Sequence, residues 1–144
     1  MEIIAIDDDE RLFVSSMIDD WGDIDTHAIS VVVDLETSLD AGIPTGDGTR
    51  MYLYYPFEDD DVPDPTMVEP LAVFLAELYR GGHRVLVHCR MGFNRSPLVA
   101  GAVLHRLGWN GCDAVTRLRE RRPGALFNEE YARYLEALRC GVEP

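Results

Sequence analysis

Short apolar runs separated by turn-forming residues dominate the first two thirds of the chain. These runs predict strands over residues 2–6, 11–14, 29–35, 51–55 and 85–87. The third run contains Val31-Val32-Val33, and such a β-branched run is typical of a central, buried strand. A polar segment over residues 34–48, with several glycines and a proline, predicts a loop.

Helical patterns alternate with the later strands. A helix is predicted over residues 65–80, with Asp64 as its N-cap, Pro65 at the first helical position and Gly81-Gly82 at its end. Further helices are predicted from Pro97 onward, over residues 113–121, and after the cap residue Asn128. Residues 15–21 predict a short helix capped by serine.

One loop joins the predicted strand 85–87 to the helix that begins near Pro97, and it carries candidate chemistry. Cys89 opens this loop, Gly92 lies within it, and Arg95 follows the cysteine by six positions. Consecutive backbone N–H groups beside a helix N-terminus suit a tetrahedral oxyanion, and arginine can grip two of its oxygens. The same field would stabilise a thiolate on Cys89 and make it a nucleophile.

The stretch from His88 to Ser96 reads His-Cys-x-x-Gly-x-x-Arg-Ser. It resembles the signature of the cysteine-dependent protein tyrosine phosphatases, and the chain length and surroundings resemble the small dual-specificity branch. Arg122-Pro123 and the segment from Asn128 are similar to the closing part of that domain. We therefore expect one α/β domain over residues 1–144. Its central, mostly parallel sheet of four to five strands would be flanked by helices on both faces, with the site at the carboxyl end of strand 85–87.

The resemblance implies a role for each loop residue. Cys89 would be the nucleophile that forms a phosphocysteine, and Arg95 would clamp the phosphate. His88 would support the loop by hydrogen bonding. Ser96 would donate a hydrogen bond to the Cys89 sulfur, cap the following helix, or do both. Backbone amides across the loop would bind the phosphate, those of Arg90, Met91, Gly92, Phe93, Asn94 and Arg95.

The leaving oxygen of a phosphate ester needs a proton, so a general acid is required. Members of the family supply an aspartate from a loop upstream of the cysteine. Asp59, which lies 30 residues before Cys89, best matches the apolar-x-Asp pattern of that loop. Asp60, Asp61 and Asp64 are the alternatives.

Composition limits the partners. The formal net charge is −13, which disfavours nucleic acid and anionic membrane surfaces. No apolar run approaches the length of a membrane span, and the acidic N-terminus is unlike a signal peptide, so a cytoplasmic protein is expected. Three cysteines in such a chain do not indicate a disulfide framework. The arginines of residues 117–122 are interpreted as a solvated helix face. A monomeric protein is favoured.

The expected function is phosphomonoester hydrolysis through phosphocysteine, without a metal or another cofactor. The expected substrates are phosphotyrosine, with phosphoserine and phosphothreonine as further candidates, in phosphorylated proteins. Two alternatives remain open at this point. One is the same chemistry on an RNA 5′-phosphate, an inositol phosphate or a small molecule. The other is a catalytically inactive phospho-binding module.

Overall fold

The computed structural model describes residues 1–45 and 50–138. In these residues one five-stranded sheet has the order β1-β2-β5-β3-β4. The strands are β1 (Ile4–Ala5), β2 (Leu12–Ser15), β3 (Val31–Asp34), β4 (Met51–Tyr54) and β5 (Val85–His88). Strand β1 runs antiparallel to β2, and every other neighbouring pair is parallel. The predicted mostly parallel sheet is confirmed.

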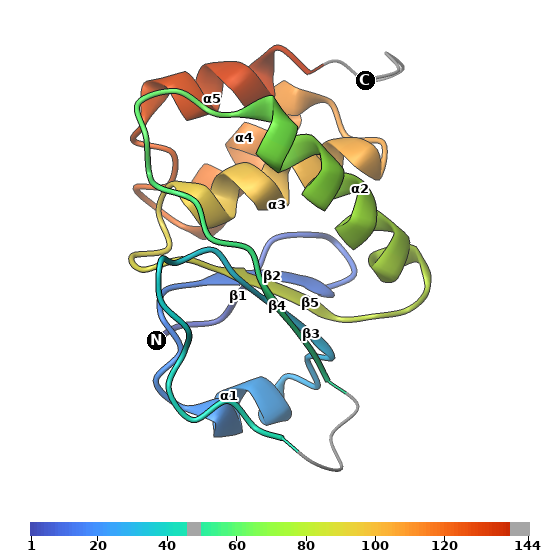
Figure 1. Cartoon of the computed structure of the whole chain (residues 1–144). Coiled ribbons are helices and arrows are strands. Elements are labelled where there is room, and N and C mark those ends of the chain that lie inside the picture. Colours follow the sequence, from blue (N-terminus) through green and yellow to red (C-terminus); the bar gives the residue numbers. More distant parts are fainter. Residues whose placement is uncertain (46–49, 139–144) are drawn as a thin grey trace.

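Helices cover both faces of this sheet, as expected for the α/β class (Figure 1). Helices α2 to α5 lie on one face, and the short helix α1 lies on the other. Their bounds are Trp21–Thr26 for α1, Pro65–Arg80 for α2, Arg95–Arg106 for α3, Gly111–Arg121 for α4 and Glu129–Glu136 for α5. No helix in the described part of the chain is both long and apolar enough to cross a membrane.

Side-chain alternation along the central strands divides the core into two clusters. In β5, Val85 and Val87 belong to the larger cluster, together with buried side chains of α2 to α5. Leu86, which points the opposite way, belongs to the smaller cluster with Ile24 of α1. Because β5 lies between two parallel strands and is buried on both faces, its carboxyl end is held firmly in the middle of the sheet.

Local capping signals explain where three of the helices begin. The Asp64 side chain accepts a hydrogen bond from the Thr66 backbone at the start of α2. Asn110 and Asn128 cap α4 and α5 in the same way. The predicted helix 65–80 and the cap at Asn128 are confirmed, whereas α4 begins at Gly111, two residues earlier than predicted.

The predicted helix over residues 15–21 is wrong. Ser15 is the last residue of β2, where it pairs with His88, and the backbone N–H of Met17 donates to the Arg90 carbonyl at 3.2 Å. Because of this sheet pairing and this hydrogen bond, residues 15–17 lie beside the loop that follows β5. Helix α1 begins only at Trp21, after Asp20 supplies the N-cap. Of the predicted loop 34–48, residues 46–48 lie outside the described residues.

Helices α4 and α5 meet at a glycine. A Cβ added to Gly111 would lie 1.8 Å from the Leu135 carbonyl oxygen, and the Gly111 N–H donates to the Leu138 carbonyl at 2.8 Å. The clashing atom belongs to the backbone, so no rotamer change relieves it.

We predict that Gly111→Ala lowers the free energy of unfolding by about 2–3 kcal/mol, because α5 must move away from α4. Urea unfolding followed by circular dichroism measures this. Gly81→Ala is the matched control, since an added Cβ there would meet its nearest heavy atom at 3.4 Å. Equal stability losses in the two variants would contradict the close packing of α4 on α5.

Candidate active site

Cys89 follows β5 directly and is only 3% exposed. Its sulfur accepts a hydrogen bond from the Gly92 backbone N–H, with 3.3 Å between N and Sγ. The Ser96 hydroxyl lies 3.3 Å from the same sulfur. Two hydrogen-bonding groups therefore converge on one sulfur at the amino end of α3.

Gly92 gives the loop its turn. Its φ is +77°, and a Cβ there would come within 3.0 Å of backbone atoms of Ser15 and Ser16. Left-handed backbone and close approach to another chain segment both favour glycine. The loop therefore lies directly against the end of β2.

Ser96 does not cap the helix, so that part of its predicted role is wrong. Helix α3 begins at Arg95 with Asn94 at the N-cap position, and Ser96 lies inside the first turn. Its side chain is fully buried and faces the Cys89 sulfur instead.

Arg95 is anchored by backbone carbonyls. Its Nη1 donates to the carbonyl oxygens of Leu35, at 3.2 Å, and Phe57, at 2.9 Å. These residues follow β3 and β4, so the guanidinium spans the carboxyl ends of neighbouring strands. Glu36 lies nearby and is buried. Burial first, and then repulsion from Asp34, raise the pKa of Glu36, while the positive charge of Arg95 acts in the opposite direction.

A second arginine, which the sequence pattern placed on a solvated helix face, supports the loop from outside. Arg122 Nη2 donates to the Met91 carbonyl at 2.9 Å, and Nε donates to the Gly92 carbonyl at 3.4 Å. Its guanidinium also stacks over the Phe93 ring at 4.2 Å from the centroid. The interpretation of the arginines of residues 117–122 as a solvated helix face is therefore incomplete, since Arg122 donates hydrogen bonds to two backbone carbonyls of the cysteine loop. Arg90 and Met91 are exposed on that loop.

The four candidate acids have different surroundings. Asp59 is brought to the loop, where its Oδ2 accepts a hydrogen bond from Asn94 Nδ2 at 3.1 Å. Asp60 is held through its backbone carbonyl, which accepts from Asn128 Nδ2 at 2.9 Å. Asp59, Asp60 and Asp61 are all exposed, and the Asp64 side chain is occupied in capping α2. Among these four residues, Asp59 is the one whose side chain is hydrogen-bonded to the cysteine loop.

His88 lies in a buried network of acidic and hydroxyl groups. Its Nε2 is 2.7 Å from Asp40 Oδ2 and 3.8 Å from Asp34 Oδ1. The Tyr52 hydroxyl lies 2.5 Å from Asp34 Oδ2 and 3.0 Å from Asp40 Oδ2. Asp34 and His88 are paired in register at the ends of neighbouring parallel strands. The sequence could therefore have predicted this contact, since each residue lies at or beside the end of a predicted strand. Nothing in the sequence pattern indicated Asp40 or Tyr52.

The same group is the only set of metal-type ligands found within the described residues. Potential ligand atoms of Asp34, Glu36, Asp40 and His88 lie within 4.8 Å of one another. Hydrogen bonds already engage both oxygens of Asp34, one oxygen of Asp40 and Nε2 of His88. The arrangement is that of a hydrogen-bonded support beneath Cys89.

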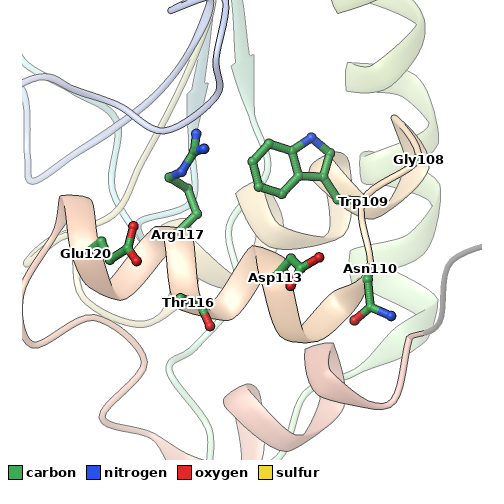
Figure 2. Close-up of a pocket in the computed structure, with 7 residues that line it drawn as sticks. All are labelled: Gly108, Trp109, Asn110, Asp113, Thr116, Arg117 and Glu120. Carbon is green, nitrogen blue, oxygen red and sulfur yellow. The ribbon is translucent and has the colours of Figure 1, made fainter.

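A separate recess of about 640 Å³ lies along α4 and the turn before it (Figure 2). Arg117 stacks over the Trp109 ring there and pairs with Asp8 at 2.7 Å. Asp8 precedes the amino end of β2, whereas Cys89 follows the carboxyl end of the parallel strand β5. The recess is therefore at the opposite end of the sheet from the cysteine loop.

Comparison with known proteins agrees with this geometry. The model of the dual specificity phosphatase catalytic domain matches residues 18–139, so the chain belongs to that family. It is 34% identical over 87 residues to mouse protein tyrosine phosphatase type IVA 3, covering 59% of this chain and 50% of the mouse protein. It is 35% identical over 89 residues to mouse type IVA 2, covering 60% and 53%. The chain thus spans about half the length of the curated relatives it matches.

Solved structures show the same fold over nearly the whole chain. The active form of Tk-PTP superposes with a TM-score of 0.72 at 26% identity, covering 93% of this chain and 95% of that one. The Yvh1 phosphatase domain from Chaetomium thermophilum gives a TM-score of 0.76 at 24% identity and covers 94% of each chain. The expected phosphatase-like fold is therefore confirmed.

We predict that Tyr52→Phe destabilises the protein by about 1–3 kcal/mol, because it leaves the buried Asp34 Oδ2 without the hydroxyl that donates to it. Burial and the hydrogen bond to Asp34 raise the pKa of Tyr52 above its ordinary value of 10.0. The stability that the protonated hydroxyl contributes is thus fully present below about pH 10 and is lost as the pH rises further.

Urea unfolding across pH 7–11 measures this difference. Tyr54→Phe, at an exposed tyrosine of the same strand, is the control. The stability gap between wild type and Tyr52→Phe should narrow at alkaline pH. A gap that widens there would contradict the inferred protonation.

Proposed function

We propose that this protein hydrolyses phosphomonoesters through a phosphocysteine intermediate on Cys89, with phosphorylated proteins as substrates. The observation that carries the proposal is the Cys89 sulfur itself. It lies within 3.3 Å of both the Gly92 N–H and the Ser96 hydroxyl, at the amino end of α3. Membership of the dual specificity phosphatase family supports the same chemistry.

The first step transfers the phosphoryl group to sulfur. The Cys89 thiolate attacks phosphorus, a P–S bond forms, and the P–O bond to the leaving group breaks. Asp59 gives its proton to the departing oxygen, so that an alcohol or phenol leaves rather than its anion. The backbone amides of residues 90–95 and the Arg95 guanidinium stabilise the equatorial oxygens, where negative charge is concentrated in the transition state.

The second step restores the enzyme. Asp59, now a carboxylate, takes a proton from a water molecule whose oxygen attacks phosphorus. The P–S bond breaks, inorganic phosphate forms, and the electron pair returns to the sulfur as a thiolate. A hydrogen bond from Ser96 stabilises this leaving thiolate at 3.3 Å, which is the role that its burial beside Cys89 supports. His88 would hold the strand end beneath Cys89 through its contact with Asp40.

Phosphotyrosine in proteins is the substrate class we favour, with phosphoserine and phosphothreonine as further candidates. The names of the type IVA relatives identify those proteins as tyrosine phosphatases. An RNA 5′-phosphate is disfavoured by the net charge of −13. An inositol phosphate or another small ester remains the main alternative. A purely binding module is disfavoured because Cys89 and Arg95 are both in place in one loop.

We further propose that the chain acts as one domain and a monomer in the cytoplasm, without nucleic acid or membrane partners. A catalytic thiolate is oxidation-prone, so it needs a reducing compartment. Cys89 and Cys112 are free thiols, whereas Cys140 lies outside the described residues.

We predict that Cys89→Ser lowers hydrolysis of para-nitrophenyl phosphate by at least about a thousand-fold while the fold is retained, because the nucleophile is lost. A phosphopeptide panel measured alongside identifies the substrate class. Cys112→Ser, which replaces an exposed cysteine, is the control and should stay active. Turnover that survives in Cys89→Ser would remove the phosphocysteine mechanism, and activity on small esters alone would favour a non-protein substrate.

We predict that Asp59→Ala slows the hydrolysis of a phosphotyrosine peptide by about 10²–10⁴-fold, because the phenolate of tyrosine is a poor leaving group when it is not protonated. Hydrolysis of 2,4-dinitrophenyl phosphate, whose leaving group needs no proton, should change far less. Steady-state kinetics on both esters make the comparison. Asp60→Ala and Asp61→Ala are the controls, and a leaving-group-selective loss in either one would reassign the acid.

A further inference from the structure

We propose that Asn94 is a positioning residue that orients the general acid Asp59, a role that rests on the proposed function. Asn94 belongs to the cysteine loop, and its backbone amide is one of those proposed to bind the phosphate. Its side chain is 4% exposed and contacts two other segments of the chain. These contacts connect the loop to the segment that carries Asp59 and to the start of α5.

The conformation of Asn94 departs from what its place in the chain favours. It occupies the N-cap position of α3, yet its side chain makes no capping hydrogen bond there. An asparagine cap usually contributes about 1 kcal/mol to a helix. Here the amide turns away from its own helix, so its polar atoms are available for contacts outside α3.

Both polar atoms of the amide are used in those contacts. Nδ2 donates to Asp59 Oδ2 at 3.1 Å, and Oδ1 accepts from the Asn128 backbone N–H at 3.0 Å. The three residues are separated by 35 and 34 positions along the chain. A buried amide with its donor and its acceptor both occupied has a fixed orientation, because flipping it would set like groups against each other.

Asn128 completes a brace around Asp59. Its Nδ2 donates to the Asp60 carbonyl at 2.9 Å, while its Oδ1 caps α5 through the Glu130 N–H at 3.1 Å. The segment that carries the acid is therefore tied through the Asp59 side chain and the Asp60 carbonyl, in addition to the Phe57 carbonyl that Arg95 binds. Asp59 is exposed, and the bond from Asn94 holds one oxygen of its carboxyl group.

An amide suits this task chemically. Asp59 has to alternate between its protonated and its ionised form during one turnover. A neutral amide N–H can hold Oδ2 in both forms without adding charge beside the phosphate. In this arrangement the other oxygen, Oδ1, would carry the proton for the leaving group. Misplacing a catalytic group by about 1 Å can cost about a hundred-fold in rate.

The test compares Asn94→Ala with wild type on a phosphotyrosine peptide and on 2,4-dinitrophenyl phosphate. We expect kcat for the peptide to fall by about a hundred-fold, and kcat for the dinitrophenyl ester to fall far less. Met91→Ala, at an exposed side chain of the same loop, is the matched control and should change kcat for both esters by a similar factor. Asn94→Ser serves as a second variant if the alanine protein does not fold.

A double-mutant cycle with Asp59→Ala decides whether Asn94 acts through the acid. Once Asp59 is absent, Asn94→Ala should cause no further leaving-group-selective loss. Losses that multiply in the double variant, or equal losses on both esters, would show a merely structural role and overturn the proposal. If Asp59→Ala itself lacks selectivity, the acid assignment and this inference both fail, while loss of activity in Cys89→Ser would still support the phosphocysteine mechanism.

Discussion

The position of Cys89 depends on the junction between a buried strand and a buried helix. Strand β5 is buried along its whole length, and α3 is buried from Ser96 to His105. The few residues between them are conformationally restricted, because Gly92 also packs against the backbone at the end of β2. Burial of β5 and α3 in the hydrophobic core thus helps to hold the cysteine loop in its shape.

The electrostatics of the site work against the rest of the molecule. With a net charge of −13, the surface repels phosphate in general, and three buried carboxylates, Asp34, Glu36 and Asp40, lie close behind the loop. Local positive potential comes instead from Arg95, the amino end of α3 and the Gly92 N–H, which donates to the Cys89 sulfur. Arg122 adds to it and holds two loop carbonyls, so the loop is supported from both sides.

Local signals predicted the elements well where they act alone. The helix from Pro65 to Arg80 has a cap, a proline and a terminal glycine within its own sequence, and the structure has those bounds. The strand over residues 11–14 was predicted, but the helix predicted from Ser15 is wrong, because Ser15 is typical of a helix cap and yet continues the sheet. Strand pairing with His88 decided its conformation, and that partner is distant in sequence.

The sequence by itself determined the loop of residues 88–96, since the spacing of Cys89, Gly92 and Arg95 is a short-range property of one segment. Only the tertiary structure decided which residues surround it. Asp40 and Tyr52 reach His88, and Asn94 reaches Asp59 and Asn128, because the sheet order brings separate loops to one edge. Sequence spacing does not predict such contacts, since each one depends on the path that the chain takes through the fold between the two contacting residues.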